Sequence, residues 1–142
     1  MVKIENFYPG YVIIREGEEI DTAFVIKSGT VEVFRKISEN EIISLAKLGP
    51  GQIFGEMSLF GNKKSSASVR ALNNVSVQVI DKKVFHEYLE QTPPLIKMLL
   101  EILADRLNKT TQKLLLASYM ETQHKKENEI FPIDLNQKRG KE

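Results

Sequence analysis

The first eighty residues of the chain read as short β-prone runs separated by turn sequences. One run alternates cleanly, so that Val31, Val33 and Arg35 fall on the same face of a predicted strand. The predicted strands are residues 11–14, 22–27, 30–35, 41–48, 66–71 and 75–80. Strands this short, evenly spaced and with glycine at the corners, are typical of a β-sandwich or a β-barrel.

The hydrophobic period changes to a helical one once the last of these strands ends. Asp81 is placed to cap a helix over Lys82–Gln91. Thr92 followed by Pro93 is a second helix start, with Thr as the N-cap and Pro at the first helical position. Apolar residues then recur at helical spacing as far as Met120, which fits one kinked helix or two consecutive helices.

Length and composition fit one domain with a polar extension. We expect the domain over residues 1–121 and a mobile tail over residues 122–142; acidic and basic residues balance from Glu121 onward. The chain has no cysteine, which excludes disulfides and thiol catalysis and fits a cytoplasmic location. It also lacks a secretory signal and any apolar run long enough to span a membrane, so we expect no membrane insertion.

The segment Phe54–Ala71 carries the strongest signal for a ligand. Gly55 lets the backbone approach a small molecule closely, and Glu56 places a carboxylate beside it. The turn that follows, beginning with Met57 and Ser58, offers free backbone N–H groups at its start, where an anion binds well. The segment therefore predicts a site for a small phosphorylated ligand.

This segment resembles the phosphate-binding cassette of cyclic-nucleotide-binding domains, the sensor modules of catabolite-activator-type regulators, cyclic-nucleotide-dependent kinases and gated channels. The resemblance extends over roughly residues 5 to 120. Its further motifs, in family order, are Pro9-Gly10, Gly17-Glu18, Lys27-Ser28-Gly29-Thr30-Val31 and Gly51-Gln52-Ile53-Phe54-Gly55-Glu56. It implies a mainly β fold with C-terminal α-helices, namely an antiparallel jelly-roll β-roll capped by helices.

The resemblance also implies a ligand, cyclic AMP or cyclic GMP, and roles for individual residues. Gly55 would donate its N–H to the ligand, Glu56 would accept a hydrogen bond from the ribose 2′-hydroxyl, and Ser66 would touch the phosphate. The implied ligand-binding set is Gly55, Glu56, Met57, Ser58, Ser65, Ser66 and Ala67. The long helix after Pro93 would cover the pocket and pair with its copy in a homodimer.

One position departs from the family pattern, which has an arginine nine residues after the glutamate, where this chain has Ser65. Loss of a charge-assisted hydrogen bond costs about 1.5–3 kcal/mol, so cyclic nucleotide binding is expected to be weakened or lost. Lys63 and Lys64 are candidate replacements from the loop. Arg70 is a third, although strand alternation points its side chain to the other face.

Other function classes find little support. The chain has only two histidines, His86 and His124, and both are expected at the surface, so neither a metal-dependent enzyme nor a Ser–His–acid enzyme is expected. DNA binding by this chain alone is not expected, because no helix-turn-helix fits after Glu121.

A partner site is expected on the long helix, where apolar residues follow the spacing of a short coiled-coil seam. The seam residues are Leu103, Leu107, Thr110, Leu114 and Ala117. Two functions therefore stay open. The first is a stand-alone regulatory sensor with weakened or lost nucleotide binding, and the second is a ligand-free structural or protein-interaction module that acts through its C-terminal helix.

Overall fold

The computed structural model of the protein describes residues 2–61 and 64–130. The chain divides into two compact units, Met1–Asp105 and Arg106–Glu142. The strands are β1 (Lys3–Phe7), β2 (Val12–Ile14), β3 (Thr22–Ser28), β4 (Val31–Ser38), β5 (Glu41–Leu48), β6 (Ile53–Phe54), β7 (Ser68–Ala71) and β8 (Val75–Asp81). The helices are the 3₁₀ turn η1 (Glu56–Phe60), α1 (Lys82–Glu90) and α2 (Pro94–Ile130).

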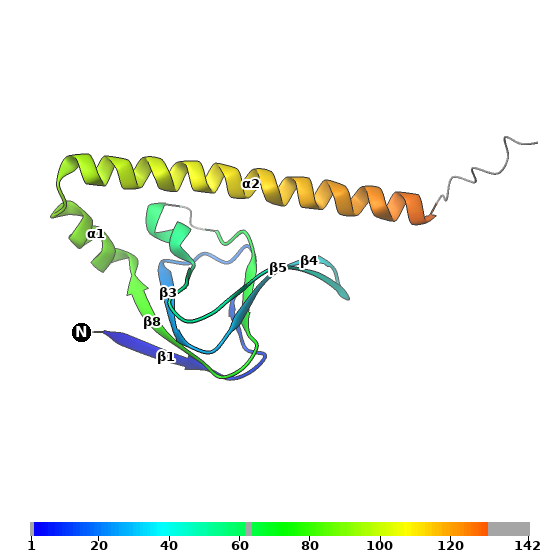
Figure 1. Cartoon of the computed structure of the whole chain (residues 1–142), viewed down its shortest axis with the longest axis horizontal. Helices are drawn as coiled ribbons and strands as arrows, with labels where there is room; N and C mark the ends of the chain where they lie inside the picture. The colour runs from blue at the N-terminus through cyan, green and yellow to red at the C-terminus, as the bar shows by residue number, and fades with distance from the viewer. Residues whose placement is uncertain (1, 62–63, 131–142) are drawn as a thin grey trace, which may run out of the picture. The chain divides into compact units, whose positions relative to one another are not determined.

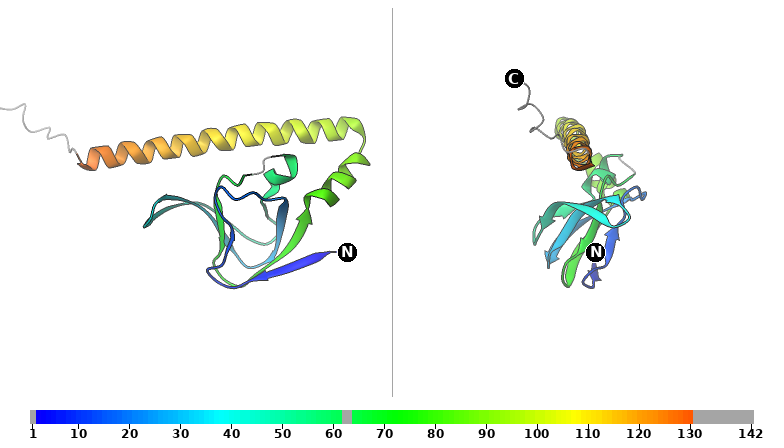
Figure 2. Two further views of the ribbon diagram at one scale, coloured as in Figure 1. Left: turned by 180° about the vertical axis from the view of Figure 1, so that it is seen from behind. Right: turned by 90° about the vertical axis from the view of Figure 1, so that its right-hand side faces the viewer.

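The strands form two four-stranded antiparallel sheets, in the orders β1-β8-β3-β6 and β2-β7-β4-β5. Strands that follow one another in sequence mostly lie in different sheets, as a jelly roll requires. Figure 1 shows β1, β8 and β3 side by side, and both Figure 1 and the left view of Figure 2 show β4 and β5 projecting as a long ribbon. The predicted fold class, a β-roll followed by helices, is confirmed.

The core lies between the two sheets and is built from the inward-facing residues of most strands. Its members are Ile14, Phe24, Ile26, Val31, Phe54, Val69, Ala71, Val75 and Val77. Phe24 and Phe54 stack with ring centroids 5.0 Å apart, which fixes β6 against β3 beside the start of the predicted cassette. The cassette therefore begins directly from a packed part of the roll.

Two strands were not predicted from the sequence. β1 is largely polar, and it is a strand because its backbone pairs with β8 from Lys3↔Val79 to Phe7↔Val75. β6 has only two residues and is defined by its pairing with β3. Neither strand has a hydrophobic period of its own, so tertiary pairing decides both.

The first helix start is confirmed, whereas the second was wrong in detail. The Asp81 carboxylate accepts the backbone N–H of Lys83 at 2.7 Å, as an N-cap does. Thr92 does not cap α2; its hydroxyl donates to the carbonyl of Tyr88 at 3.0 Å. The helix begins at Pro94, so the second proline of the pair takes the first helical position.

α2 is one continuous helix that ends at Ile130. It therefore extends into the segment assigned to a mobile tail, because the residues from Glu121 onward are rich in Glu, Gln and Lys, which favour helix even without an apolar face. The division between the two compact units falls within α2, after Asp105, and the domain boundary at residue 121 stays a prediction. Residues 131–142, the rest of the expected tail, lie outside the described residues.

Candidate functional site

Gly55 is fixed by the backbone between β6 and η1. Its φ is +74°, a left-handed conformation that residues with a side chain rarely adopt. A Cβ atom there would lie 3.0 Å from the Thr22 carbonyl oxygen and 3.3 Å from Ile14 Cδ1. The glycine is thus required by the roll itself, whatever its role towards a ligand.

The hydroxyl and the backbone amide of Ser58 are hydrogen-bonded within the protein. Its side chain is buried, and its hydroxyl lies 2.7 Å from the Gly55 carbonyl oxygen and 3.1 Å from that of Thr22. Its backbone N–H donates to the Gly55 carbonyl at 3.2 Å, so this amide is not among the free donors at the start of η1. Ser58 therefore anchors the turn to β3, while Met57 is half-buried beside it.

Glu56 is half-buried at the first position of η1. Within residues 2–61 and 64–130, its carboxylate has neither a hydrogen bond nor an ion pair. A half-buried carboxylate normally acquires a partner, because desolvation is costly without one. Glu56 therefore has no partner within the described part of the roll, and its acceptor capacity stays available.

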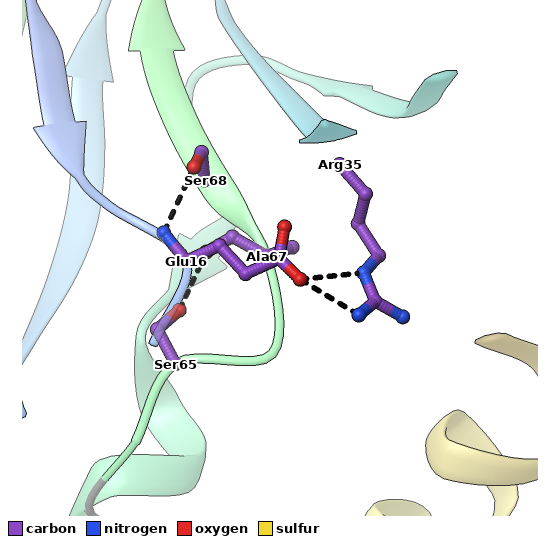
Figure 3. A network of polar contacts seen from close by, with 5 residues as sticks. All are labelled: Glu16, Arg35, Ser65, Ala67 and Ser68. Carbon is purple, nitrogen blue, oxygen red and sulfur yellow. Dashed lines mark hydrogen bonds and ion pairs between the residues drawn. The ribbon is translucent and has the colours of Figure 1, made fainter. Parts of the chain in front are cut away.

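Ser65 stands on the other side of the cassette, where the family pattern has arginine. Its hydroxyl donates to the carbonyl of Ala67 at 2.6 Å, so it is engaged within the cassette itself (Figure 3). Ser66 is exposed and Ala67 is buried at 7% exposure. The neutral hydroxyl of Ser65 thus neither carries a charge nor offers its proton freely.

The described contacts do not place the candidate cations, those that could replace an arginine at position 65, at the cassette. Arg70 Nη2 lies 3.2 Å from Glu32 Oε1, and its guanidinium carbon lies 4.9 Å from the centroid of the Phe34 ring. Arg70 therefore points away from the cassette face, as the alternation predicted. Lys64 is exposed at an isolated bridge with Glu19, and Lys63 lies outside the described residues.

A different arginine approaches the cassette. Arg35 of β4 donates from Nε and Nη2 to Glu16 Oε1, at 3.0 and 2.7 Å. Figure 3 shows this pair beside Ala67, with the Glu16 backbone bonded to Ser68. Sequence reasoning placed Arg35 on the face of Val31 and Val33 but did not connect it to the cassette, although that shared face was the available signal.

The two histidines lie at the surface of the described part of the chain. His86 and His124 are both exposed, as expected. No group of three or more His, Cys, Asp or Glu side chains comes together to hold a metal within the described residues. No helix in the described ranges has the length and hydrophobicity needed to cross a lipid bilayer.

The jelly roll carries the short helical turn η1 between β6 and β7. The family model for the cyclic nucleotide-binding domain matches residues 4–92. The chain belongs to this family.

Curated relatives are regulators. The chain is 28% identical over 109 residues to the CRP-like cAMP-activated global transcriptional regulator of Mycobacterium tuberculosis, covering 77% of this chain and 49% of the relative. It is 30% identical over 121 residues to the cyclic AMP receptor protein of Thermus thermophilus, covering 84% of this chain and 56% of the relative. The chain thus spans about half the length of these relatives.

A solved relative is the EAL enzyme Bd1971 in its cAMP-bound form. It has a TM-score of 0.69 and 32% identity, over 91% of this chain and 33% of that chain. The same enzyme in its cGMP-bound form has a TM-score of 0.67 and 32% identity, over 87% of this chain and 33% of that chain. Relatives of this domain therefore take either cyclic nucleotide as ligand.

Proposed function

We propose that this chain is a regulatory module that binds cyclic AMP or cyclic GMP in its β-roll, with an affinity weakened by Ser65. The observation that carries the proposal is the half-buried Glu56, which has no partner among the described residues and follows the left-handed Gly55. A ribose hydroxyl would complete the carboxylate's hydrogen bonding. The cAMP- and cGMP-bound forms of Bd1971 support the choice of ligand.

The weakened affinity follows from charge. A cyclic phosphate carries one negative charge, which an arginine matches with several donors in one plane. Ser65 offers a single hydroxyl, and that hydroxyl already donates to Ala67. At about 1.4 kcal/mol for each tenfold in affinity, loss of about 1.5–3 kcal/mol weakens binding by roughly ten- to a hundredfold.

Calorimetric titration with cyclic AMP and cyclic GMP tests this proposal. We expect weak binding by the native chain and binding about ten- to a hundredfold tighter by Ser65→Arg. Ser38→Arg is the matched control, because it adds the same charge at an exposed position of the β4–β5 ribbon. Failure of both the native chain and Ser65→Arg to bind would leave the ligand-free interaction module as the function.

The signal would leave the cassette through α1. Phe60, at the end of η1, meets Phe85 of α1 edge to face, with ring centroids 5.3 Å apart. A ligand that moves η1 would therefore change the packing of α1 and bias two arrangements of the C-terminal helices. The regulator relatives support a regulatory rather than catalytic output, and a cytoplasmic location belongs to the same proposal.

A second proposal concerns self-association through α2. Leu103, Leu107 and Leu114 of the predicted seam are 59%, 51% and 64% exposed. Exposed leucines at this spacing favour a helical partner, and a second copy of the chain supplies one. Light scattering should show a dimer that Leu107→Glu dissociates, whereas Gln112→Glu, an exposed position off the seam, should leave it intact. A monomeric native chain would direct the search to another protein partner.

A further inference from the structure

The described contacts bring Arg35 of β4 towards the loop that holds Ser65, through its pair with Glu16. Its guanidinium is held by Glu16, with Nε and Nη2 both directed at Oε1. Both side chains are partly exposed, at 36% for Arg35 and 30% for Glu16. The pair is therefore ordered but still in contact with solvent.

Glu16 belongs to a segment that is bonded to the cassette along its backbone. Its N–H donates to Ser68 Oγ at 2.8 Å, and the next amide, that of Gly17, donates to the Ser65 carbonyl at 2.8 Å. The Ser65 amide donates in turn to the carbonyl of Glu18 at 2.9 Å. These bonds fix the position of Glu16 relative to Ser65, and Glu16 then fixes Arg35 (Figure 3).

The guanidinium retains unused donors. Arginine has five N–H groups, and only Nε and one N–H of Nη2 are directed at Glu16. The other N–H groups of Arg35 have no hydrogen-bond partner in the described part of the chain. Donors of this kind, on a cation held in place by a carboxylate, suit an anionic oxygen.

We propose that Arg35 contacts the phosphate of the bound cyclic nucleotide and supplies part of the positive charge that position 65 lacks. This inference rests on the proposed function, because it assigns a role within the same site. Glu16 acts as a positioning residue that holds the guanidinium beside the cassette. The remaining anchoring charge thus comes from β4, and the absence of a second guanidinium at position 65 still weakens binding.

The test measures cyclic AMP affinity by calorimetry for Arg35→Gln in two backgrounds, the native chain and Ser65→Arg. In the native background we expect affinity to fall about ten- to a hundredfold. In the Ser65→Arg background the same substitution should cost much less, because the new guanidinium already carries the phosphate contact. Lys36→Gln, which removes a charge from the adjacent exposed residue of β4, should leave affinity unchanged in both backgrounds.

Each other outcome contradicts the inference in a distinct way. An equal loss in both backgrounds would assign Arg35 a structural role, and no loss in the native background would mean that it does not touch the phosphate. Binding by Ser65→Arg but not by the native chain would show that Arg35 does not replace the missing charge, while the proposed site itself would stand. Absence of binding in both backgrounds would remove the site and the inference together.

Discussion

Two glutamate–arginine pairs involve the β2-β7-β4-β5 sheet, and they differ in how far the glutamate is buried. In the first, Glu32 and Arg70 face each other across the β4–β7 ladder, and the Glu32 side chain is only 9% exposed. In the second, Arg35 reaches Glu16 outside the ladder, and both side chains are about one third exposed. The first pair is part of the sheet, whereas the second joins the sheet to a loop.

The difference separates stability from binding. Arg70 is enclosed by Glu32 and Phe34, and its Nε atom is buried without a hydrogen-bond partner among the described residues. Its unpaired donors lie on the Glu32 and Phe34 side of the strand, which points away from the cassette face, so they are not offered to a ligand there. Arg35 is as exposed as Arg70, but its partner Glu16 lies in the segment bonded to the cassette, and the same chemical pair can therefore serve recognition at one place and packing at the other.

The largest effect is expected from Arg70→Ala, which leaves the buried Glu32 carboxylate without its partner. Breaking a buried pair costs about 3–5 kcal/mol, and partial exposure of Arg70 reduces our expectation to about 2–3 kcal/mol. Chemical denaturation should show this loss in the free energy of unfolding. A loss no greater than that for Arg35→Ala would contradict the contrast between the two pairs.

A smaller effect on stability is expected from Arg35→Ala. Partly exposed ion pairs contribute about 0–1 kcal/mol, so the denaturation midpoint should move little. The variant should nevertheless lose most of its affinity for cyclic AMP, if Arg35 acts as inferred above. A large stability loss would place this pair with Glu32 and Arg70, as a part of the sheet.

The smallest effect on stability is expected from a third pair, Glu90 with Lys97. This pair lies at the surface and extends the comparison to the least buried case. The hydrogen bond and the positive charge of Lys97 lower the pKa of Glu90 below its ordinary value. A lowered pKa contributes stability above the unfolded-state pKa, and this contribution is lost as pH falls through the folded-state value.

Carboxyl NMR titration checks this third pair. The Glu90 midpoint should rise in Lys97→Gln and stay unchanged in Lys83→Gln, an exposed lysine on α1. Equal midpoints in the native chain and in Lys97→Gln would mean that the pair does not persist in solution.

Local patterns in the sequence were sufficient for much of the fold. The alternation around Val33 and the carboxylate of Asp81 act within a few residues, so the central strands and the start of α1 were predicted correctly. β1 escaped prediction because its strand character comes from pairing with β8. Thr92 was misjudged because it lies within reach of Tyr88, so its hydroxyl closes the preceding helix instead of opening the next.

The site was less accessible to sequence reasoning, for the same physical reason. Gly55 and Glu56 are recognisable because they are adjacent and belong to a compact motif. The pairing of Arg35 with Glu16 is not recognisable from the sequence, because the two residues are nineteen positions apart and only Arg35 belongs to a strand. Only the folded chain brings the two side chains together, and with them the candidate charge for the ligand.

The two backbone hydrogen bonds of Ser65 have a mechanical consequence. Since its amide and carbonyl are both hydrogen-bonded to the segment Gly17–Glu18, a displacement of the cassette also moves the loop that precedes β3. Local opening of either segment must expose the amides of both Gly17 and Ser65, so their hydrogen–deuterium exchange should accelerate or slow in concert. A ligand that stiffens one segment thereby stiffens a stretch of chain almost fifty residues away in sequence.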